Sequence, residues 1–150
     1  MEVSTSSQAI GRDLEDQIET LLRAWSVPYH RGYTIVTSFR SRFALDFWLP
    51  PAPGRSAVVI EAKNFGVVAL STANSRNRKA QEALYLLTHV RRHCEQTRES
   101  RILLINGAKQ FSTEQVSFLK AEIGPDFHVV SISEPEHFRT LVLPSGRYDV

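Results

Sequence analysis

The sequence predicts an α/β domain in which helices cover a mixed central sheet. Two long segments, about 6–25 and 75–97, repeat apolar residues at the three- and four-residue spacing of a helix. Between them lie three short runs rich in aromatic and β-branched residues, and two further short apolar runs alternate with helix-like segments after them. The predicted order is therefore α-β-β-β-α-β-α-β-α, which implies helices on both faces of the sheet.

The first helix is expected to begin at Ser6 or Ser7, whose hydroxyl can cap it, and to end near residue 25. One apolar stripe runs along it: Leu14, Ile18, Leu21, Leu22 and Trp25. A strand over 29–38 follows, because this run is rich in Tyr, Thr, Ile and Val.

The next two strands are expected at 43–49 and 57–63. The segment 50–54 between them reads Pro-Pro-Ala-Pro-Gly, and proline lacks the N–H that a strand interior needs. This segment is therefore a loop, and the two runs form an antiparallel hairpin.

The second half of the chain predicts a helix over 75–97 and two helix–strand alternations. The apolar face of that helix consists of Ala80, Ala83, Leu84, Leu87 and Val90. The all-apolar run 101–105 is typical of a central strand covered on both sides. A helix follows from Ser112, a capping residue, to Gly124, a helix stop. The last strand is expected at 127–132, and a short closing helix at 134–142.

The composition is that of one ordinary globular domain spanning residues 1–150. Apolar residues make up 42% of the chain, and the net charge is +2, so a nucleic-acid partner would need a clustered basic patch. Cys94 is the only cysteine, which excludes an internal disulfide and predicts a buried structural thiol. No secretory signal and no bilayer-spanning apolar segment is recognisable, so we expect a cytoplasmic protein without a membrane partner.

Three charged residues interrupt the two apolar runs of the hairpin: Asp46, Glu61 and Lys63. Glu61 and Lys63 share one face of their strand, and pairing of the strands brings Asp46 alongside Glu61. Adjacent carboxylates repel unless a cation lies between them, and Mg²⁺ or Mn²⁺ with the backbone carbonyl of Ala62 fits this need. The alternative is a structural salt bridge between Lys63 and one of the two acids.

The flanking helices add further polar candidates. Glu15 borders the apolar stripe of the first helix, where it could join the site or be an ordinary solvated acid. Gln81 and Tyr85 are four residues apart and lie on one side of the long helix. Together with Arg78 and Arg92 they form a stripe that could follow a sugar-phosphate backbone, or simply a solvated helix face.

Basic residues cluster in two other places. Arg40 and Arg42 lie at the turn that follows the first strand, and Arg76, Arg78 and Lys79 lie at the start of the long helix. Positive side chains at a helix N-terminus oppose the helix dipole, which favours a role in binding phosphate. Exposed basic residues of this kind also serve solubility.

In the order in which they occur, these motifs resemble those of the PD-(D/E)XK nuclease superfamily. The resemblance covers about residues 8–106 and rests on Gly-Arg-Asp-Leu-Glu at 11–15, Asp46, Glu-Ala-Lys at 61–63, and Gln81 with Tyr85. It implies the restriction-endonuclease-like core α-β-β-β-α-β, which agrees with the predicted order. Residues after 106 are similar to the end of Mrr-type restriction enzyme domains, although that group often carries Gln-x-Lys where this chain has Glu61-Ala62-Lys63.

The resemblance implies a role for each matching residue. Asp46 and Glu61 look like the metal-binding acids, Lys63 like the catalytic lysine and Glu15 like the accessory acid. Gln81 and Tyr85 look like the Gln-x-x-x-Tyr feature of the RecB-like and lambda-exonuclease-like branches, and Gln81 is expected to act in catalysis by bracing Lys63 or the phosphate. The residue before Asp46 is leucine, where the family pattern has proline.

The expected activity is that of a Mg²⁺- or Mn²⁺-dependent deoxyribonuclease, an endonuclease of restriction, repair or recombination. A Holliday-junction resolvase, an exonuclease, a non-catalytic DNA-binding module on the same fold, and cleavage of RNA stay open as alternatives. Because one small domain offers little room for both catalysis and base recognition, we expect a homodimer or membership of a larger nuclease assembly.

Overall fold

A computed structural model describes residues 7–37, 40, 42–63, 73–107 and 111–144. Its elements follow in this order along the chain: α1 (Ser7–Ala24), β1 (His30–Val36), β2 (Arg42–Leu49), β3 (Val58–Lys63), α2 (Ala73–His93), a 3₁₀ turn (Glu95–Thr97), β4 (Arg101–Asn106), α3 (Thr113–Ile123), β5 (Phe127–Ser131) and α4 (Pro135–Val142). The predicted order of helices and strands is confirmed.

The five strands form one mixed sheet in the order β1-β2-β3-β4-β5. The pairs β1–β2 and β2–β3 are antiparallel, which confirms the predicted hairpin, whereas β3–β4 and β4–β5 are parallel. Each parallel pair is joined through a helix, as the crossover between parallel strands requires. The carboxyl ends of β3, β4 and β5 therefore meet at one edge of the sheet.

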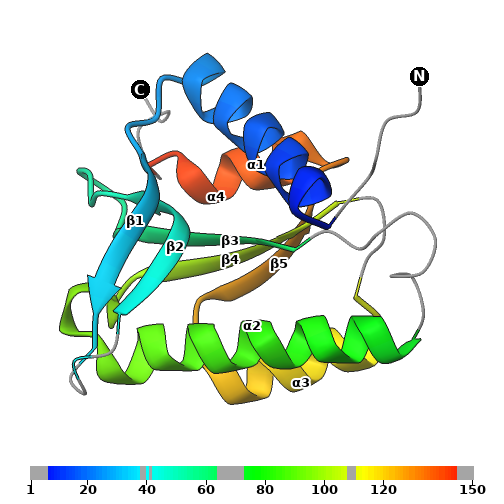
Figure 1. Cartoon of the computed structure of the whole chain (residues 1–150). Helices are drawn as coiled ribbons and strands as arrows, with labels where there is room; N and C mark the ends of the chain where they lie inside the picture. The colour runs from blue at the N-terminus through cyan, green and yellow to red at the C-terminus, as the bar shows by residue number, and fades with distance from the viewer. Residues whose placement is uncertain (1–6, 38–39, 41, 64–72, 108–110, 145–150) are drawn as a thin grey trace, which may run out of the picture.

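Helices cover both faces of the sheet, α1 and α4 on one side and α2 and α3 on the other (Figure 1). Each pair encloses its own core. The α1 side buries Leu14, Ile18, Leu22, Phe47 and Phe138, and the α2 side buries Leu45, Leu87, Val90, Ile102 and Leu104. Burial of a large apolar side chain contributes about 1.5–3 kcal/mol, so these two layers fix the strands that carry the candidate site.

Local signals set the ends of α3 where the sequence predicts them, whereas α2 ends at His93, before the predicted end at residue 97, and Glu95–Thr97 form a 3₁₀ turn. Ser112 accepts from the backbone N–H of Gln115, whose side chain accepts from the N–H of Ser112, so the expected cap of α3 is confirmed. Gly124 ends α3 with φ of +104°, a value that favours glycine. Cys94 is buried in the α2 layer, as predicted. None of the helices described is long and apolar enough to cross a membrane.

Candidate active site at the end of the β2–β3 hairpin

The paired backbones of β2 and β3 part where the charged residues begin. The ladder runs from Leu49–Val58 to Phe47–Ile60. One step further, the N–H of Ala62 donates to Oδ2 of Asp46 over 2.7 Å instead of to a β2 carbonyl. Because the N–H and C=O of a strand residue point to the same neighbour, the carbonyl of Ala62 faces the same side as Asp46.

A change of face in β2 aims Asp46 at this position. Leu45 packs in the α2 layer and Phe47 in the α1 layer, although residues two apart on a regular strand share one face. Gly32 stands across from Asp46 in β1, between two paired neighbours, and has φ of +70°. Glycine adopts this conformation at little cost, so Gly32 permits both strands to change face at the level of Asp46.

Glu61 is the most deeply buried carboxylate of the site. It is 7% exposed, and its Oε1 has no hydrogen-bond partner among the residues that the structure describes. Burial, and then the negative charge of Asp46, raise the pKa of Glu61 well above its usual value. Burial also raises the pKa of Asp46, against the opposing effects of the Ala62 N–H and of Lys63. Ionisation of both carboxyl groups is therefore disfavoured, and a positive charge placed between them would favour their ionised forms.

Lys63 follows Glu61 on the same face of β3 and points toward α2. Its Nζ lies 3.3 Å from Oε1 of Glu82, and its side chain is 16% exposed. Within the described part of the chain, the ion pair of Lys63 is thus with Glu82 and not with Asp46 or Glu61, so the simple salt-bridge interpretation of the Glu-x-Lys triplet is wrong. The structure does bring Asp46, Glu61 and Lys63 to one end of the hairpin.

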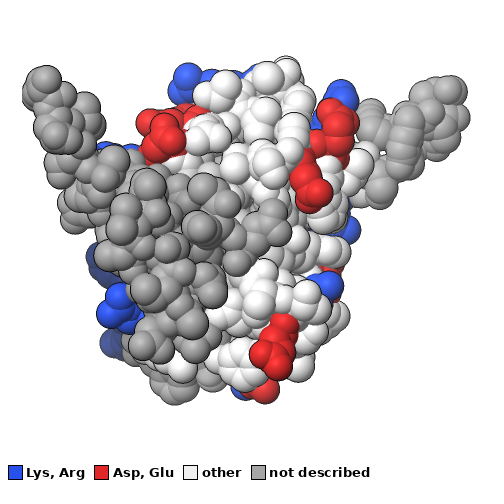
Figure 2. Space-filling view, turned by 90° about the vertical axis from the view of Figure 1, so that its right-hand side faces the viewer, with Lys and Arg blue, Asp and Glu red and all other residues white. Residues whose placement is uncertain are grey.

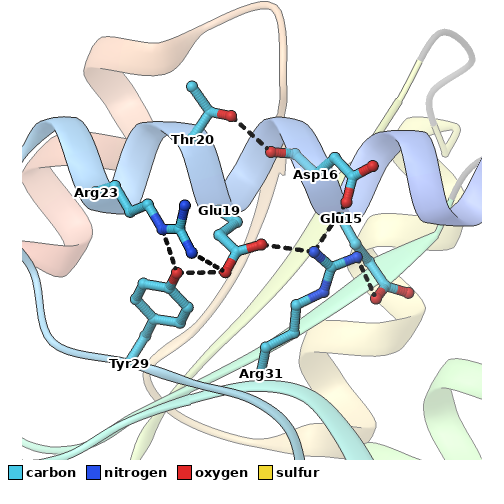
Figure 3. Close-up of polar contacts among 7 residues, drawn as sticks. All are labelled: Glu15, Asp16, Glu19, Thr20, Arg23, Tyr29 and Arg31. Atoms are coloured by element: carbon cyan, nitrogen blue, oxygen red, sulfur yellow. Dashed lines mark hydrogen bonds and ion pairs between the residues drawn. The ribbon is translucent and has the colours of Figure 1, made fainter.

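Glu15 extends from α1 toward Asp46, but its carboxylate is paired with the guanidinium of Arg31. Its Oε1 lies 3.4 Å from Nη2 of Arg31, whose Nη1 also contacts Asp16 at 2.8 Å and Glu19 at 2.6 Å (Figure 3). Burial and the negative charge of Asp46 raise the pKa of Glu15, whereas Arg31 lowers it. The carboxylate of Glu15 therefore interacts electrostatically with that of Asp46, although it is paired with Arg31.

The same network ties α1 to the start of β1. The hydroxyl of Tyr29 donates to Glu19 and accepts from Nε of Arg23 at 2.9 Å (Figure 3). Hydrogen bonds from Tyr29 and Arg31 lower the pKa of Glu19. Glu19 therefore helps to hold α1 against β1 through this network. Of the acids in α1 that pair with Arg31, Glu15 is the one whose pKa is raised by the charge of Asp46.

The donors present fit a divalent cation that keeps part of its water shell. No three His, Cys, Asp or Glu side chains of the described segments form a metal-holding group as they stand. Asp46, Glu61 and the Ala62 carbonyl offer hard oxygen donors, and Mg²⁺ characteristically retains several waters beside one or two carboxylates. The unpartnered Oε1 of Glu61 is an acceptor that such an ion would satisfy.

Gln81 and Tyr85 lie on the outer side of α2. With Leu84, Thr88, His89 and Glu122 they line an open hollow of about 270 Å³ between α2 and α3. The ring of Tyr85 is 4.5 Å from that of His89 and 6.1 Å from that of Phe43. Thus Glu82, next to Gln81, makes the contact with Lys63, while Gln81 faces the hollow.

The predicted DNA-contacting residues are exposed where the structure describes their side chains. Arg40, Arg42, Arg78 and Arg92 are exposed, and Nη2 of Arg92 also donates to the carbonyl of Glu122. The side chains of Arg76 and Lys79 lie outside the described residues. On the face shown in Figure 2, the visible described Lys and Arg side chains lie near its edges, and acidic side chains are also exposed there.

Three polar residues next to the site were not predicted from the sequence. Arg31 pairs with Glu15, Glu82 pairs with Lys63, and Asn106 ends β4 beside Lys63. Two of them carried a sequence signal. Asn106 is the polar residue that closes an apolar run, and Glu82 lies on the same helix as Gln81 but one residue further round. For Arg31 no signal in the sequence links it to α1.

Comparison with protein-family models and with curated proteins finds no match to this chain.

Proposed function

We propose that this chain is a Mg²⁺- or Mn²⁺-dependent deoxyribonuclease, an endonuclease of the PD-(D/E)XK type. The observation that carries the proposal is the parting of β2 and β3 around two adjacent carboxylates, the buried Glu61 and the half-buried Asp46. Asp46 replaces a strand partner of Ala62, and Glu61 beside it keeps Oε1 without a partner among the described residues. Clustered buried acids destabilise a fold that has no cation for them, which supports a metal as their reason for being there.

The residues divide the work of phosphodiester hydrolysis as follows. Asp46, Glu61 and the Ala62 carbonyl would hold the cation, and Glu15 would reach its waters once Arg31 releases it. The bound metal supplies charge neutralisation at the scissile phosphate and an acidified water. Lys63 brings an ammonium to the phosphate oxygens, where it orients the attacking water and offsets the negative charge that develops. Gln81, Tyr85 and the exposed arginines would contact the DNA backbone.

The test is cleavage of DNA by purified protein with Mg²⁺ or Mn²⁺. Supercoiled, linear, single-stranded and four-way-junction DNA are digested beside RNA, which separates endonuclease, exonuclease, resolvase and ribonuclease activity. Asp46→Asn and Lys63→Met are expected to cut at least about 100-fold more slowly than wild type. Glu136→Gln, on exposed α4, is the control and keeps full activity. Equal cleavage by all four proteins contradicts the assignment.

A DNA-binding module without catalysis is the second candidate. The observation that favours it is the absence of a three-ligand group within the described residues. Thermal unfolding with Mn²⁺ separates the two candidates. A nuclease site is expected to be stabilised by Mn²⁺ in wild type and not in Asp46→Asn, whereas a module that binds only DNA shows no such stabilisation in either protein.

The expectation of a homodimer or of a larger nuclease assembly stays a prediction. A sizing column run with and without a DNA duplex tests it. A dimer that forms only on DNA elutes as a monomer without the duplex and as a dimer–DNA complex with it.

A further inference from the structure

A row of polar side chains crosses the carboxyl ends of the three parallel strands. Lys63 of β3 pairs in register with Asn106 of β4, which pairs with Ser131 of β5. All three belong to the α2 face of the sheet, because Leu104 and Val129, two residues before Asn106 and Ser131, pack in the α2 layer. The carboxyl edge of parallel strands is where open α/β sheets bind ligands.

Asn106 differs from Ser131, its neighbour on β5, in the hydrogen bonding of its side-chain oxygen. It is 3% exposed, and its Oδ1 has no hydrogen-bond partner within the described part of the chain. Ser131 is also buried, but its hydroxyl lies 2.7 Å from that of Ser133 and accepts from the Ser133 N–H. A buried amide oxygen without a partner destabilises the fold, so Asn106 is an acceptor for which the described residues supply no donor.

Lys63 is a hydrogen-bond donor in register with Asn106 on the neighbouring strand. It lies beside Asn106 on the same face, and an ammonium group has three N–H donors, of which Glu82 takes one at most. Glu82 is exposed, and ion pairs of this kind hold a lysine only weakly. The negative charge of an approaching phosphate repels Glu82 and attracts Lys63, so the lysine leaves this pair when DNA enters.

We propose that Asn106 is a positioning residue of the active site, whose Oδ1 accepts a hydrogen bond from the Lys63 ammonium when that ammonium turns from Glu82 to the scissile phosphate. The inference rests on the proposed nuclease function. Bonded to a fixed buried oxygen, Lys63 reaches the phosphate in one orientation, with its other N–H groups free for the phosphate and the attacking water.

The test compares two substitutions that differ in one acceptor. Asn106→Leu keeps the size of the side chain and removes the oxygen, and Asn106→Asp keeps an acceptor. We expect Asn106→Leu to lower kcat about 10- to 100-fold with KM for DNA and the Mn²⁺-induced rise in melting temperature unchanged. Asn106→Asp is expected to hold kcat within about fivefold of wild type.

The melting temperature distinguishes a positioning role of Asn106 from a purely structural one, because loss of a structural residue would lower it. Removing an unpartnered buried amide is expected to leave the melting temperature of Asn106→Leu unchanged or higher. Ser131→Ala is the matched control in the same row, and it loses a hydrogen bond that is made. Its melting temperature is expected to fall while its kcat stays that of wild type.

Three results overturn the inference: wild-type kcat in Asn106→Leu, a lowered melting temperature in that variant, or an equal loss of kcat in the leucine and aspartate variants. Wild type and Lys63→Met are digested in parallel. If wild type does not cut, the proposed function fails and this inference fails with it. If wild type cuts, Lys63→Met does not, and Asn106→Leu cuts as wild type, then only the role of Asn106 is refuted.

Discussion

The two ends of the parallel pair β3–β4 differ in how many of their buried polar groups have hydrogen-bond partners. At the amino end, Nε of Arg101 donates to Asp126 at 3.0 Å and its Nη1 donates to the carbonyl of Leu141 at 2.9 Å. The guanidinium of Arg55 donates to three backbone carbonyls close by. Two of the carbonyls bound at this end belong to the last turn of α4, where unpaired carbonyl groups carry partial negative charge. The hydrogen bonds of Arg55 and Arg101 thus fasten the end of α4 to this end of the sheet.

The carboxyl end keeps acceptors that the described residues leave without donors. Oε1 of Glu61 and Oδ1 of Asn106 are both buried oxygens of this kind. Within the described segments neither oxygen atom has a hydrogen-bond partner, and a positively charged or hydrogen-donating occupant would satisfy both. The amino end therefore stabilises the fold, whereas the unpartnered acceptors of the carboxyl end cost stability that the proposed ligand would offset, so substitutions at the two ends should have opposite effects on the free energy of unfolding.

The largest expected effect is that of Glu61→Gln. The amide has nearly the same shape and carries no charge, so it relieves the repulsion with Asp46 and weakens metal binding. We expect cleavage to fall at least about 100-fold, while the free energy of unfolding of the metal-free protein rises by roughly 1–3 kcal/mol. Plasmid digestion and urea unfolding in a chelator measure the two quantities.

Asp126→Asn is the matched control at the other end. Hydrogen bonds from His128 and Arg101 lower the pKa of Asp126, so its charge stabilises the fold. Because the side chain is 40% exposed, the loss is expected to be no more than about 1 kcal/mol, with cleavage unchanged. Should both variants lose stability, or both lose cleavage, the contrast between the two ends would be refuted.

The pH dependence of stability should also differ in sign between the ends. The pKa of Glu61 is raised above its usual 4.5, so between 4.5 and the folded pKa the folded chain holds a proton that the unfolded chain releases. Stability from this group falls as pH rises through that window, by at most about 1.4 kcal/mol per pH unit. Asp126, whose pKa is lowered, loses its contribution as pH falls through its folded pKa.

Unfolding of metal-free wild type, Glu61→Gln and Asp126→Asn across pH measures these slopes. The difference between wild type and Glu61→Gln isolates Glu61 from Asp46 and Glu15, whose raised pKa values act in the same direction. A wild-type curve parallel to that of Glu61→Gln above pH 4.5 would show that Glu61 is ionised in the folded protein at its ordinary pKa.

Much of the fold could be predicted because its signals are local. The proline-rich loop at 50–54 marked the hairpin, and the capping box at Ser112 fixed the start of α3. The three charged residues of the hairpin stood out because each interrupts an apolar run, and the short turn between the strands left few ways to separate them. Local patterns thus led to the site as well as to the sheet.

The rest depends on contacts between distant segments. That Lys63 meets Glu82 and not Gln81 follows from the rotation of α2 against the sheet, which one strand triplet and one helix motif cannot determine. The ion pair between Arg31 and Glu15 follows from how α1 crosses β1. Gly32 looks like an ordinary loop or strand glycine until its partner across the ladder is known to be Asp46.

The next largest effect is expected for Gly32→Ala, which tests whether Gly32 sets the direction of the Asp46 side chain. Gly32→Ala forces a Cβ into a backbone with φ of +70°, although no atom lies within 4 Å of the position it would take. The strain alone is expected to cost about 1–2 kcal/mol of stability, or to turn β1 and move Asp46 from Ala62. We expect cleavage and Mn²⁺ stabilisation to fall together with the melting temperature.

Gly124→Ala provides the control for that strain. Gly124 has φ of +104°, and its Cβ would also meet open space, but it lies at the end of α3. The alanine variant is expected to lose a similar amount of stability and to keep cleavage. If both alanine variants keep the same cleavage at a temperature where both are folded, Gly32 is a strand irregularity without influence on Asp46.

The smallest effect is expected for Glu82→Gln, which tests whether the ion pair of Lys63 is a resting state. If the chain has the proposed nuclease function, removing the carboxylate frees Lys63 and takes away a negative charge that would repel DNA, so KM for DNA should fall by about two- to threefold at low salt. The melting temperature should barely change, since this exposed pair contributes at most about 1 kcal/mol. Glu136→Gln, which removes a charge from the exposed pair with Arg139 on α4, leaves KM unchanged. A KM that rises in Glu82→Gln would mean that Glu82 holds Lys63 in its working position, and the carboxyl end would then supply its own partner for the lysine.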